Sequence, residues 1–330
     1  MIRLAGGLIL AGLALASCGW LLLGQKGSGK ADISVLDKPS EFAANRAADQ
    51  FDGKRAMTYL EDLCRIGPRI SGGDGMRKQQ QLLEKHFETL GGRIEWQRFT
   101  ARQKSQRKPI EMANLIVSWH PQRQRRIILC SHYDTRPIAD QELDRRKWTE
   151  PFVSANDGGS GVALLMEMGH LIKKISVRVG VDFVFFDGEE YIFDPAPQGD
   201  IYFFGSEHFA QTYRKNPPSH QYTAAVLLDM IGGKNARFPI EQNSMFQAGD
   251  LVQELWKIAA EQKCIAFANE MGPEVRDDHL ALNRVRIPAA DIIDLDFPHW
   301  HRLSDIPANC SADSLEQVAR VLLVWLQRLK

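Results

Sequence analysis

Hydrophobic residues recur along the chain with two different periods, and each period predicts a different kind of element. Within residues 41–91 two sets of apolar residues fall at helical spacing: Ala56, Leu60, Leu63 and Cys64, then Leu83, Phe87 and Leu90. Gly91 and Gly92 follow the second set directly, and a glycine pair of this kind ends a helix by adopting a left-handed conformation. We therefore expect two amphipathic helices before the first strand.

The remainder of the chain alternates between short apolar runs, typical of buried strands, and longer segments with helical spacing. The runs predict strands at 93–99, 113–119, 127–130, 181–186, 224–228 and 289–295. The longer segments predict helices at 161–175, 206–213, 251–261 and 315–329. This alternation indicates an α/β fold: a single domain with a central, mostly parallel mixed sheet flanked by helices on both faces.

Composition and charge narrow the classes of protein that fit this pattern. The chain has 330 residues, of which 44% are hydrophobic and 25% are charged, the usual balance of a soluble globular protein. Its 41 basic and 41 acidic side chains cancel, so no excess of positive charge is present to cover phosphates. We expect no nucleic-acid partner, and we interpret the basic run 123–126 as a solvated turn.

The cysteines exclude two further classes of site. They lie at positions 18, 64, 130, 264 and 310 with no Cys-x-x-Cys pair, a spacing that supports neither a structural zinc module nor a disulfide framework. One disulfide among the last four remains open. A metal ion in this chain must therefore be bound by histidines and carboxylates.

The N-terminal segment 1–24 is apolar after Arg3 and is typical of a signal peptide or a membrane anchor. Residues 15–18 resemble the lipobox of bacterial lipoproteins, in which Cys18 would carry the lipid. The apolar stretch 4–23 is also about long enough to span a bilayer as a helix, so both outcomes stay open. Either one predicts an exported, tethered protein, periplasmic or at the cell surface, that meets the membrane only here. Residues 25–40 then form a linker to a catalytic domain at 41–330.

Metal-binding residue types follow several of the predicted strands. These residues are His132, Glu189, Glu190, Asp229 and His301. Asp157 lies in a glycine-rich turn between the predicted strands 127–130 and 181–186. Each alone could be a helix cap or a solvated histidine, but the carboxyl ends of parallel strands meet at one edge of a sheet. Imidazole and carboxylate ligands suit zinc, and a catalytic zinc site uses three of them. The joint pattern therefore predicts a zinc site.

The adjacent pair Glu189 and Glu190 indicates how such a site would work. Two neighbouring carboxylates after a strand cannot both point the same way. One can bind the metal while the other faces the substrate and transfers protons. The pair therefore predicts an enzyme.

Over about residues 50–330 the order of these motifs resembles the zinc-dependent exopeptidase fold, which includes co-catalytic zinc aminopeptidases and animal-type glutaminyl-peptide cyclotransferases. The motifs are HYD at 132–134, NDGGSG at 156–161, FFDGEE at 185–190, LLD at 227–229 and WH at 300–301. The resemblance favours the cyclotransferases, because a long loop at 191–204 follows the paired glutamates and a doubled aspartate with a histidine occurs at 277–279.

The cyclotransferase resemblance implies conversion of the N-terminal glutamine of a peptide or protein to pyroglutamate, with release of ammonia. It implies one zinc ion bound by Asp157, Glu190 and His301. It assigns acid/base catalysis to Glu189. It further implies two supporting aspartates and a tryptophan beside the substrate: Asp229, Asp278 and Trp300.

The alternative is an aminopeptidase with two zinc ions bridged by Asp157. This resemblance implies a second metal site at His132 and Asp229, and the NDGGSG turn is similar to the peptidase version. The pocket aromatic of the cyclotransferases would fall near Pro195, and the second cysteine of their disulfide would fall near Val162. Neither position carries the residue type that the cyclotransferases have there. A third interpretation is a non-catalytic domain of the same fold. A zinc content of one, two or none would separate the three.

Overall fold

The structure is a computed structural model that describes residues 49–329. The segments 1–24 and 25–40, with Cys18, lie outside the described residues. Between residues 49 and 329, no helix combines the length and the apolar character needed to cross a membrane.

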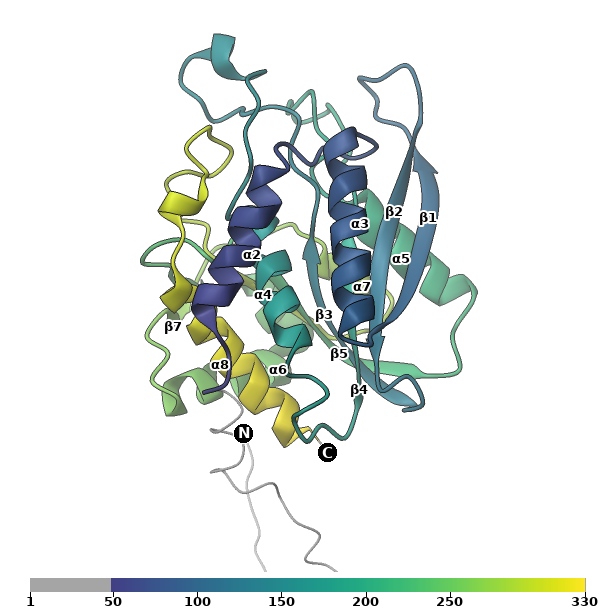
Figure 1. Ribbon diagram of the computed structural model, residues 1–330, viewed down its shortest axis with the longest axis vertical. Helices are drawn as coiled ribbons and strands as arrows, with labels where there is room; N and C mark the ends of the chain where they lie inside the picture. Colours follow the sequence, from purple (N-terminus) through teal and green to yellow (C-terminus); the bar gives the residue numbers. More distant parts are fainter. Residues whose placement is uncertain (1–48, 330) are drawn as a thin grey trace, which may run out of the picture. The chain divides into compact units, whose positions relative to one another are not determined.

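A six-stranded mixed sheet is the central layer (Figure 1). Its strands are β1 (Arg93–Ala101), β2 (Ile110–Trp119), β3 (Arg125–His132), β4 (Gly180–Phe186), β5 (Gln221–Asp229) and β8 (Ala289–Ile293). They are ordered β1-β2-β4-β3-β5-β8, with β4, β3, β5 and β8 parallel and β1 and β2 antiparallel. The predicted α/β domain with a mostly parallel mixed sheet is confirmed.

Helices cover both faces of this sheet. One apolar core contains residues of α2 (Gly53–Arg65), α3 (Asp74–Thr89), α4 (Gly159–Gly169), α6 (Gln242–Glu261) and α8 (Ala312–Arg328). A second core, on the other face, contains residues of α5 (Phe204–Lys215) and α7 (His279–Arg284). Beside these layers lie a small sheet of β6 (Phe238–Ile240) and β7 (Phe267–Met271) and the 3-10 turns η1 (Arg145–Lys147) and η2 (Pro307–Asn309).

Strand β3 shows why the central strands read as continuous apolar runs. Ile127 and Leu129 pack into the first core, whereas Ile128 and Cys130 pack into the second. Successive side chains of a strand point to opposite faces, so a strand covered on both faces is apolar at every position. Burying each large aliphatic side chain contributes about 1.5–3 kcal/mol. The cysteines Cys64, Cys130, Cys264 and Cys310 are all free and buried, so the disulfide left open is not formed.

Helix boundaries differ from the sequence pattern in two places. Helix α4 ends at Gly169, whereas the apolar pattern extends to 175, because Leu171, Ile172 and Ile175 remain buried in the loop that follows. Helix α6 begins at Gln242, well before the predicted start, and it is kinked at Ala248. The short elements β6, β7 and α7 were not predicted.

Candidate active site

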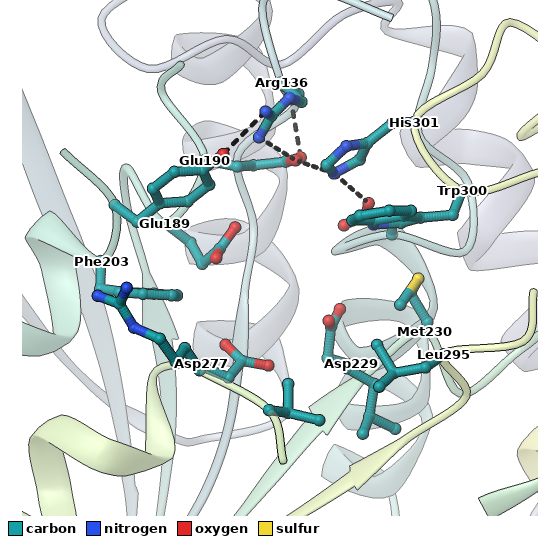
Figure 2. A pocket seen from close by; sticks show the side chains of 15 residues that line it. Arg136, Glu189, Glu190, Phe203, Asp229, Met230, Asp277, Leu295, Trp300 and His301 are labelled. Atoms are coloured by element: carbon teal, nitrogen blue, oxygen red, sulfur yellow. Dashed lines mark hydrogen bonds and ion pairs between the residues drawn. The ribbon is translucent and has the colours of Figure 1, made fainter. Parts of the chain in front are cut away.

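A cavity of about 210 Å³ opens where strands β4, β5 and β8 end (Figure 2). Five carboxylates line it: Asp157, Glu189, Glu190, Asp229 and Asp277. The other wall is apolar and aromatic: Tyr202, Phe203, Met230, Val275, Ile293, Leu295 and Trp300. Acidic groups that converge in a small, mostly apolar pocket mark a candidate catalytic site.

Two histidines approach the two oxygens of one carboxylate. The Nε2 atom of His132 lies 3.0 Å from Oδ1 of Asp157, and the Nε2 atom of His301 lies 3.4 Å from its Oδ2. His301 Nε2 also lies 3.3 Å from Oε2 of Glu190, and His132 Nε2 lies 3.2 Å from Oδ1 of Asp229. Asp157 thus stands between two groups of donors, His301 with Glu190 and His132 with Asp229.

These donors fit a zinc ion. Donor atoms of His132, Asp157 and Glu190 all lie within 4.8 Å of one another. Oδ2 of Asp157 and Oε2 of Glu190 are buried and have no hydrogen-bond partner among the described residues. A buried carboxylate oxygen without a donor is costly unless a cation satisfies it. Imidazole nitrogens and carboxylate oxygens are the ligands that zinc prefers in such sites.

Glycines bring the ligand-bearing turn close to the ends of the strands. A Cβ atom on Gly158, whose φ is +70°, would lie 2.7 Å from Cε1 of His132. A Cβ atom on Gly161 would collide with Ser131 and with the backbone of Leu228. The first turn of α4 can therefore place Asp157 between the ends of β3 and β5 only because these positions are glycine.

Carboxylates outside the cavity fix the ligand-bearing turns through backbone hydrogen bonds. Asp134 accepts hydrogen bonds from the N–H groups of Glu189 (3.1 Å) and Glu190 (3.2 Å), which ties the turn after β4 to the end of β3. Asp305 accepts a hydrogen bond from the N–H of Asp157 (3.1 Å). Each ligand is therefore oriented by a second polar group, as in preorganised metal sites.

Glu189 lies in the cavity, outside the donor set that fits the metal. Burial raises the pKa of Glu189 well above its usual value, and the neighbouring charges of Asp277 and Glu190 add to this increase while His132 opposes it. Burial also raises the pKa of Glu190, to about 7. A carboxyl group whose pKa is raised is a stronger proton acceptor, and it can hold the proton until it returns it. The predicted division of roles needs one glutamate that binds the metal and one that faces the substrate, and Glu189 lies where it could face a substrate in the cavity.

The consecutive aspartates Asp277 and Asp278 have different surroundings. Asp277 lines the cavity, whereas the side chain of Asp278 is fully buried and is not part of the cavity wall. The sequence-based prediction named Asp278, whereas in the structure the neighbouring Asp277 lines the cavity (Figure 2). Burial, together with Asp229, raises the pKa of Asp277 well above its usual value.

Two aromatic residues flank the cavity. Trp300 is 39% exposed, and its ring centroid lies 4.1 Å from that of the His301 imidazole at a tilt of 30°. Phe203 lines the cavity from the end of the loop that follows the paired glutamates, with a left-handed backbone at φ 66°. The resemblance aligned the family's pocket aromatic with a position near Pro195, where that residue type is not present, and Phe203 was not predicted from the sequence. The length of the loop was the only signal, because an irregular loop has no periodicity that could identify the residue.

Comparisons of the sequence with known proteins find relatives of this chain. Residues 114–326 match the model of peptidase family M28. The glutaminyl-peptide cyclotransferase-like protein of Bos taurus is 26% identical over 312 residues, which cover 87% of this chain and 78% of that protein.

Solved structures share the fold over most of the chain. The glutaminyl cyclase of Fimbriiglobus ruber is 51% identical, with a TM-score of 0.83 over 85% of this chain and 96% of that one. A leucine aminopeptidase precursor of Bacteroides thetaiotaomicron is 30% identical, with a TM-score of 0.78 over 85% of this chain and 98% of that one. Both kinds of relative carry the α/β domain described above.

Proposed function

The chain belongs to peptidase family M28, and we infer that it is a glutaminyl-peptide cyclotransferase. It converts the N-terminal glutamine of a peptide or protein to pyroglutamate and releases ammonia. The observation that carries this inference is a carboxyl group outside the metal donor set, Glu189, in a small cavity flanked by Trp300 and Phe203. The sequence identity of 51% to a glutaminyl cyclase over almost that whole chain supports the same reaction.

Three residues would bind one zinc ion: Asp157, Glu190 and His301. When bound, zinc supplies a Lewis acid that polarises the γ-carbonyl group of the substrate glutamine. His301 Nε2 lies 3.3 Å from Oε2 of Glu190 and 3.4 Å from Oδ2 of Asp157, and this proximity supports the proposed set of ligands.

Glu189 transfers the proton. The α-amine of the substrate attacks its own side-chain carbonyl carbon, a C–N bond forms, and the bond from that carbon to the amide nitrogen breaks. Glu189 takes a proton from the attacking amine and gives it to the leaving nitrogen, which departs as ammonia. Its raised pKa suits this role, because the protonated form must persist long enough to act as an acid.

The remaining cavity residues hold the glutamine side chain in place. We assign to Asp277, rather than to Asp278, a hydrogen bond to the substrate amide, with Asp229 beside it. Trp300 and Phe203 pack against the apolar part of the side chain and exclude water, which would otherwise compete with the amine. Holding amine and amide together in this way makes the attack intramolecular, and such orientation can supply several kcal/mol.

A peptide assay tests the reaction. The purified protein is incubated with a glutamine-initiated peptide and with its leucine-initiated counterpart, and products are identified by mass. We expect the first peptide to lose ammonia without losing a residue and the second to stay intact, because leucine has no amide to polarise. Release of free leucine, with no ammonia from the glutamine peptide, would show that the assignment is wrong.

A two-zinc aminopeptidase is the second candidate, because His132 and Asp229 form a further donor group on Asp157. In that enzyme Glu189 would activate a water molecule for hydrolysis. Zinc content measured by mass spectrometry of the metal separates the candidates, since the cyclotransferase needs one ion per chain. Two ions together with leucine release would favour the aminopeptidase.

The apolar character of residues 1–24 supports an export segment that tethers the enzyme to a membrane. Peptides and proteins outside the cytoplasm would then be its substrates. The Cys18→Ala variant separates the two forms of tether. Loss of lipid labelling and release from the membrane fraction would indicate a lipoprotein. Unchanged retention in that fraction would indicate an anchor helix, and wild-type protein in the soluble fraction would contradict both.

A further inference from the structure

Three consecutive residues of the loop before η1 contact the turn that carries His301. Oδ1 of Asp140 lies 3.0 Å from Nδ1 of His301, within hydrogen-bonding distance. The N–H of Gln141 donates a hydrogen bond to the carbonyl oxygen of His301 (3.2 Å). The carboxylate of Glu142 accepts a hydrogen bond from the N–H of Leu303 (2.9 Å). The loop thus contacts both the side chain and the backbone of a metal-type ligand.

The backbone of His301 needs such contacts. Its φ is 53°, in the left-handed region that residues with a Cβ atom rarely adopt. A non-glycine residue there costs on the order of 1–3 kcal/mol and persists only where its surroundings hold it. In this conformation Nε2 of His301 faces Glu190 and Asp157, and Nδ1 faces Asp140 (Figure 2 shows His301 beside Glu190).

Asp140 is itself held by a buried cation. Its Oδ1 lies 2.9 Å from Nε of Arg136, and its Oδ2 accepts a hydrogen bond from an Nη atom of Arg136 (3.1 Å). Arg136 is 1% exposed and also donates to the hydroxyl of Tyr202 (3.0 Å), while its backbone N–H donates to Oε1 of Glu190 (2.9 Å). Asp140 therefore has its negative charge balanced and its carboxylate fixed before any metal binds.

We propose that Asp140 is a positioning residue of the metal centre, which accepts the Nδ1 proton of His301 and thereby leaves Nε2 of His301 free to bind the metal. Ligating histidines commonly donate their second ring N–H to a carboxylate, which fixes the tautomer and makes the imidazole a better ligand. Arg136 keeps that carboxylate in place and, through Glu190 and Tyr202, connects it to a second ligand and to the cavity wall. The inference rests on the proposed function only in taking this metal centre as the catalytic one.

A simple structural role is the competing explanation, since Asp140 lies in a loop that packs against the His301 turn. The two explanations differ in what is lost with the carboxylate. A loop anchor contributes to folding whether or not metal is present. A positioning residue contributes in addition to metal affinity and to the electronic properties of the ligand set.

The test compares Asp140→Ala and Asp140→Asn with Asp144→Ala, which removes an exposed carboxylate of the same loop that pairs with Arg146. Zinc affinity is measured by competition with a chelator, and the cobalt-substituted proteins are compared by visible absorption. We expect about 10- to 100-fold weaker zinc binding and an altered cobalt spectrum for Asp140→Ala. Asp140→Asn should lose part of the affinity, because its amide oxygen still accepts the hydrogen bond but carries no negative charge, and Asp144→Ala should match the wild type.

Melting of the metal-free proteins completes the comparison. Metal-free Asp140→Ala should melt below the metal-free wild type, because buried Arg136 loses a charged partner, but the difference in Tm should be larger between the zinc-loaded proteins. Wild-type zinc affinity and cobalt spectrum in Asp140→Ala would overturn the proposal, as would an equal loss of affinity in Asp144→Ala. If Asp140→Ala fails to fold, unchanged affinity and spectrum in Asp140→Asn would overturn the proposal instead. Because no readout depends on ammonia release, the proposal can fail while the proposed reaction stands, and the reverse.

Discussion

Glu189 and Glu190 show how adjacent residues of one type acquire different roles. Oε1 of Glu190 accepts a hydrogen bond from the N–H of Arg136, whereas its Oε2 faces the imidazole of His301 and has no hydrogen-bond partner among the described residues, which leaves it available to a metal ion. Glu189 lines the cavity, and its Oε2 lies 4.0 Å from Nδ1 of His132, farther than the 3.3 Å that separates Glu190 from His301. The difference comes from direction rather than from chemistry, since the two side chains leave the same turn on different sides.

A substitution of Glu189 tests this division. Glu189→Gln keeps the shape of the side chain but cannot exchange a proton, so kcat should fall by about two to four orders of magnitude while zinc content is unchanged. Steady-state kinetics and metal analysis of the same preparation provide both values. Glu88→Gln, which alters an exposed glutamate on α3, is the matched control and should leave both values as in the wild type. Near-normal turnover in a zinc-loaded Glu189→Gln enzyme would contradict the assignment.

For some individual residues the sequence does not show whether the side chain points into the cavity. The pair Glu189 and Glu190 could be identified because both follow an apolar strand whose end is easy to locate. Asp277 and Asp278 lie in an irregular segment, so nothing in the pattern says which of two neighbours points into the pocket. Phe203 reaches the cavity through a left-handed backbone, and a conformation of that kind at a phenylalanine has no signal in the sequence.

At the level of a single element, the start of helix α6 is held by a side-chain cap. Its N-terminus is capped by Glu241, which accepts hydrogen bonds from the N–H groups of Asn243 (2.8 Å) and Val275 (2.9 Å) and from that of Ser244. Nε2 of His279 lies 3.4 Å from Oε2 of Glu241. Burial alone would raise the pKa of Glu241, but His279 and these N–H groups lower it to about 2. The cap therefore joins the first turn of α6 to the segment that leads to Asp277.

The lowered pKa of Glu241 predicts how stability depends on pH. The charged cap contributes fully above the unfolded pKa of about 4.3, and its contribution is lost as the pH falls towards the folded pKa. Removing a helix cap costs about 0.5–2 kcal/mol, so Glu241→Ala should lower the free energy of unfolding by about that amount at pH 7. Urea unfolding at pH 7 and at pH 3 measures the difference, which should shrink at the lower pH.

Glu254→Gln, an exposed position on the same helix, serves as the control and should change stability little at either pH. A loss in Glu241→Ala that is equally large at pH 3 and pH 7 would count against the charged cap. Sequence pattern alone did not find this helix start, because its first turn is mostly polar and the helix is kinked at Ala248. The central strands were predicted more closely, because burial on both faces leaves a continuous apolar run.

On the scale of the whole molecule, the metal-type ligands come from segments that are distant in the chain. His132, Asp157, Glu190 and His301 belong to the end of β3, the turn before α4, the turn after β4 and the loop after β8. Only the folded chain brings them together, so zinc should bind the folded state and not the unfolded one. Burial also raises the pKa values of Glu189 and Asp229, and a bound cation would favour their charged forms.

Metal removal should therefore destabilise the protein as a whole. A ligand that binds only the folded state at 1,000 times its dissociation constant adds about 4 kcal/mol, and about 2–4 °C of melting temperature accompanies each kcal/mol in a domain of roughly this size. A chelator should then lower Tm by about 8–16 °C, and added zinc should restore it.

For the cyclotransferase the restoration of Tm should be complete at one zinc ion per chain. Added zinc should still restore the Tm of the His132→Ala variant, whereas it should not restore the Tm of the His301→Ala variant. A wild-type titration that ends at two ions, with His132→Ala ending at one, would instead favour the aminopeptidase. An unchanged Tm with no bound zinc would mean that neither metalloenzyme is correct.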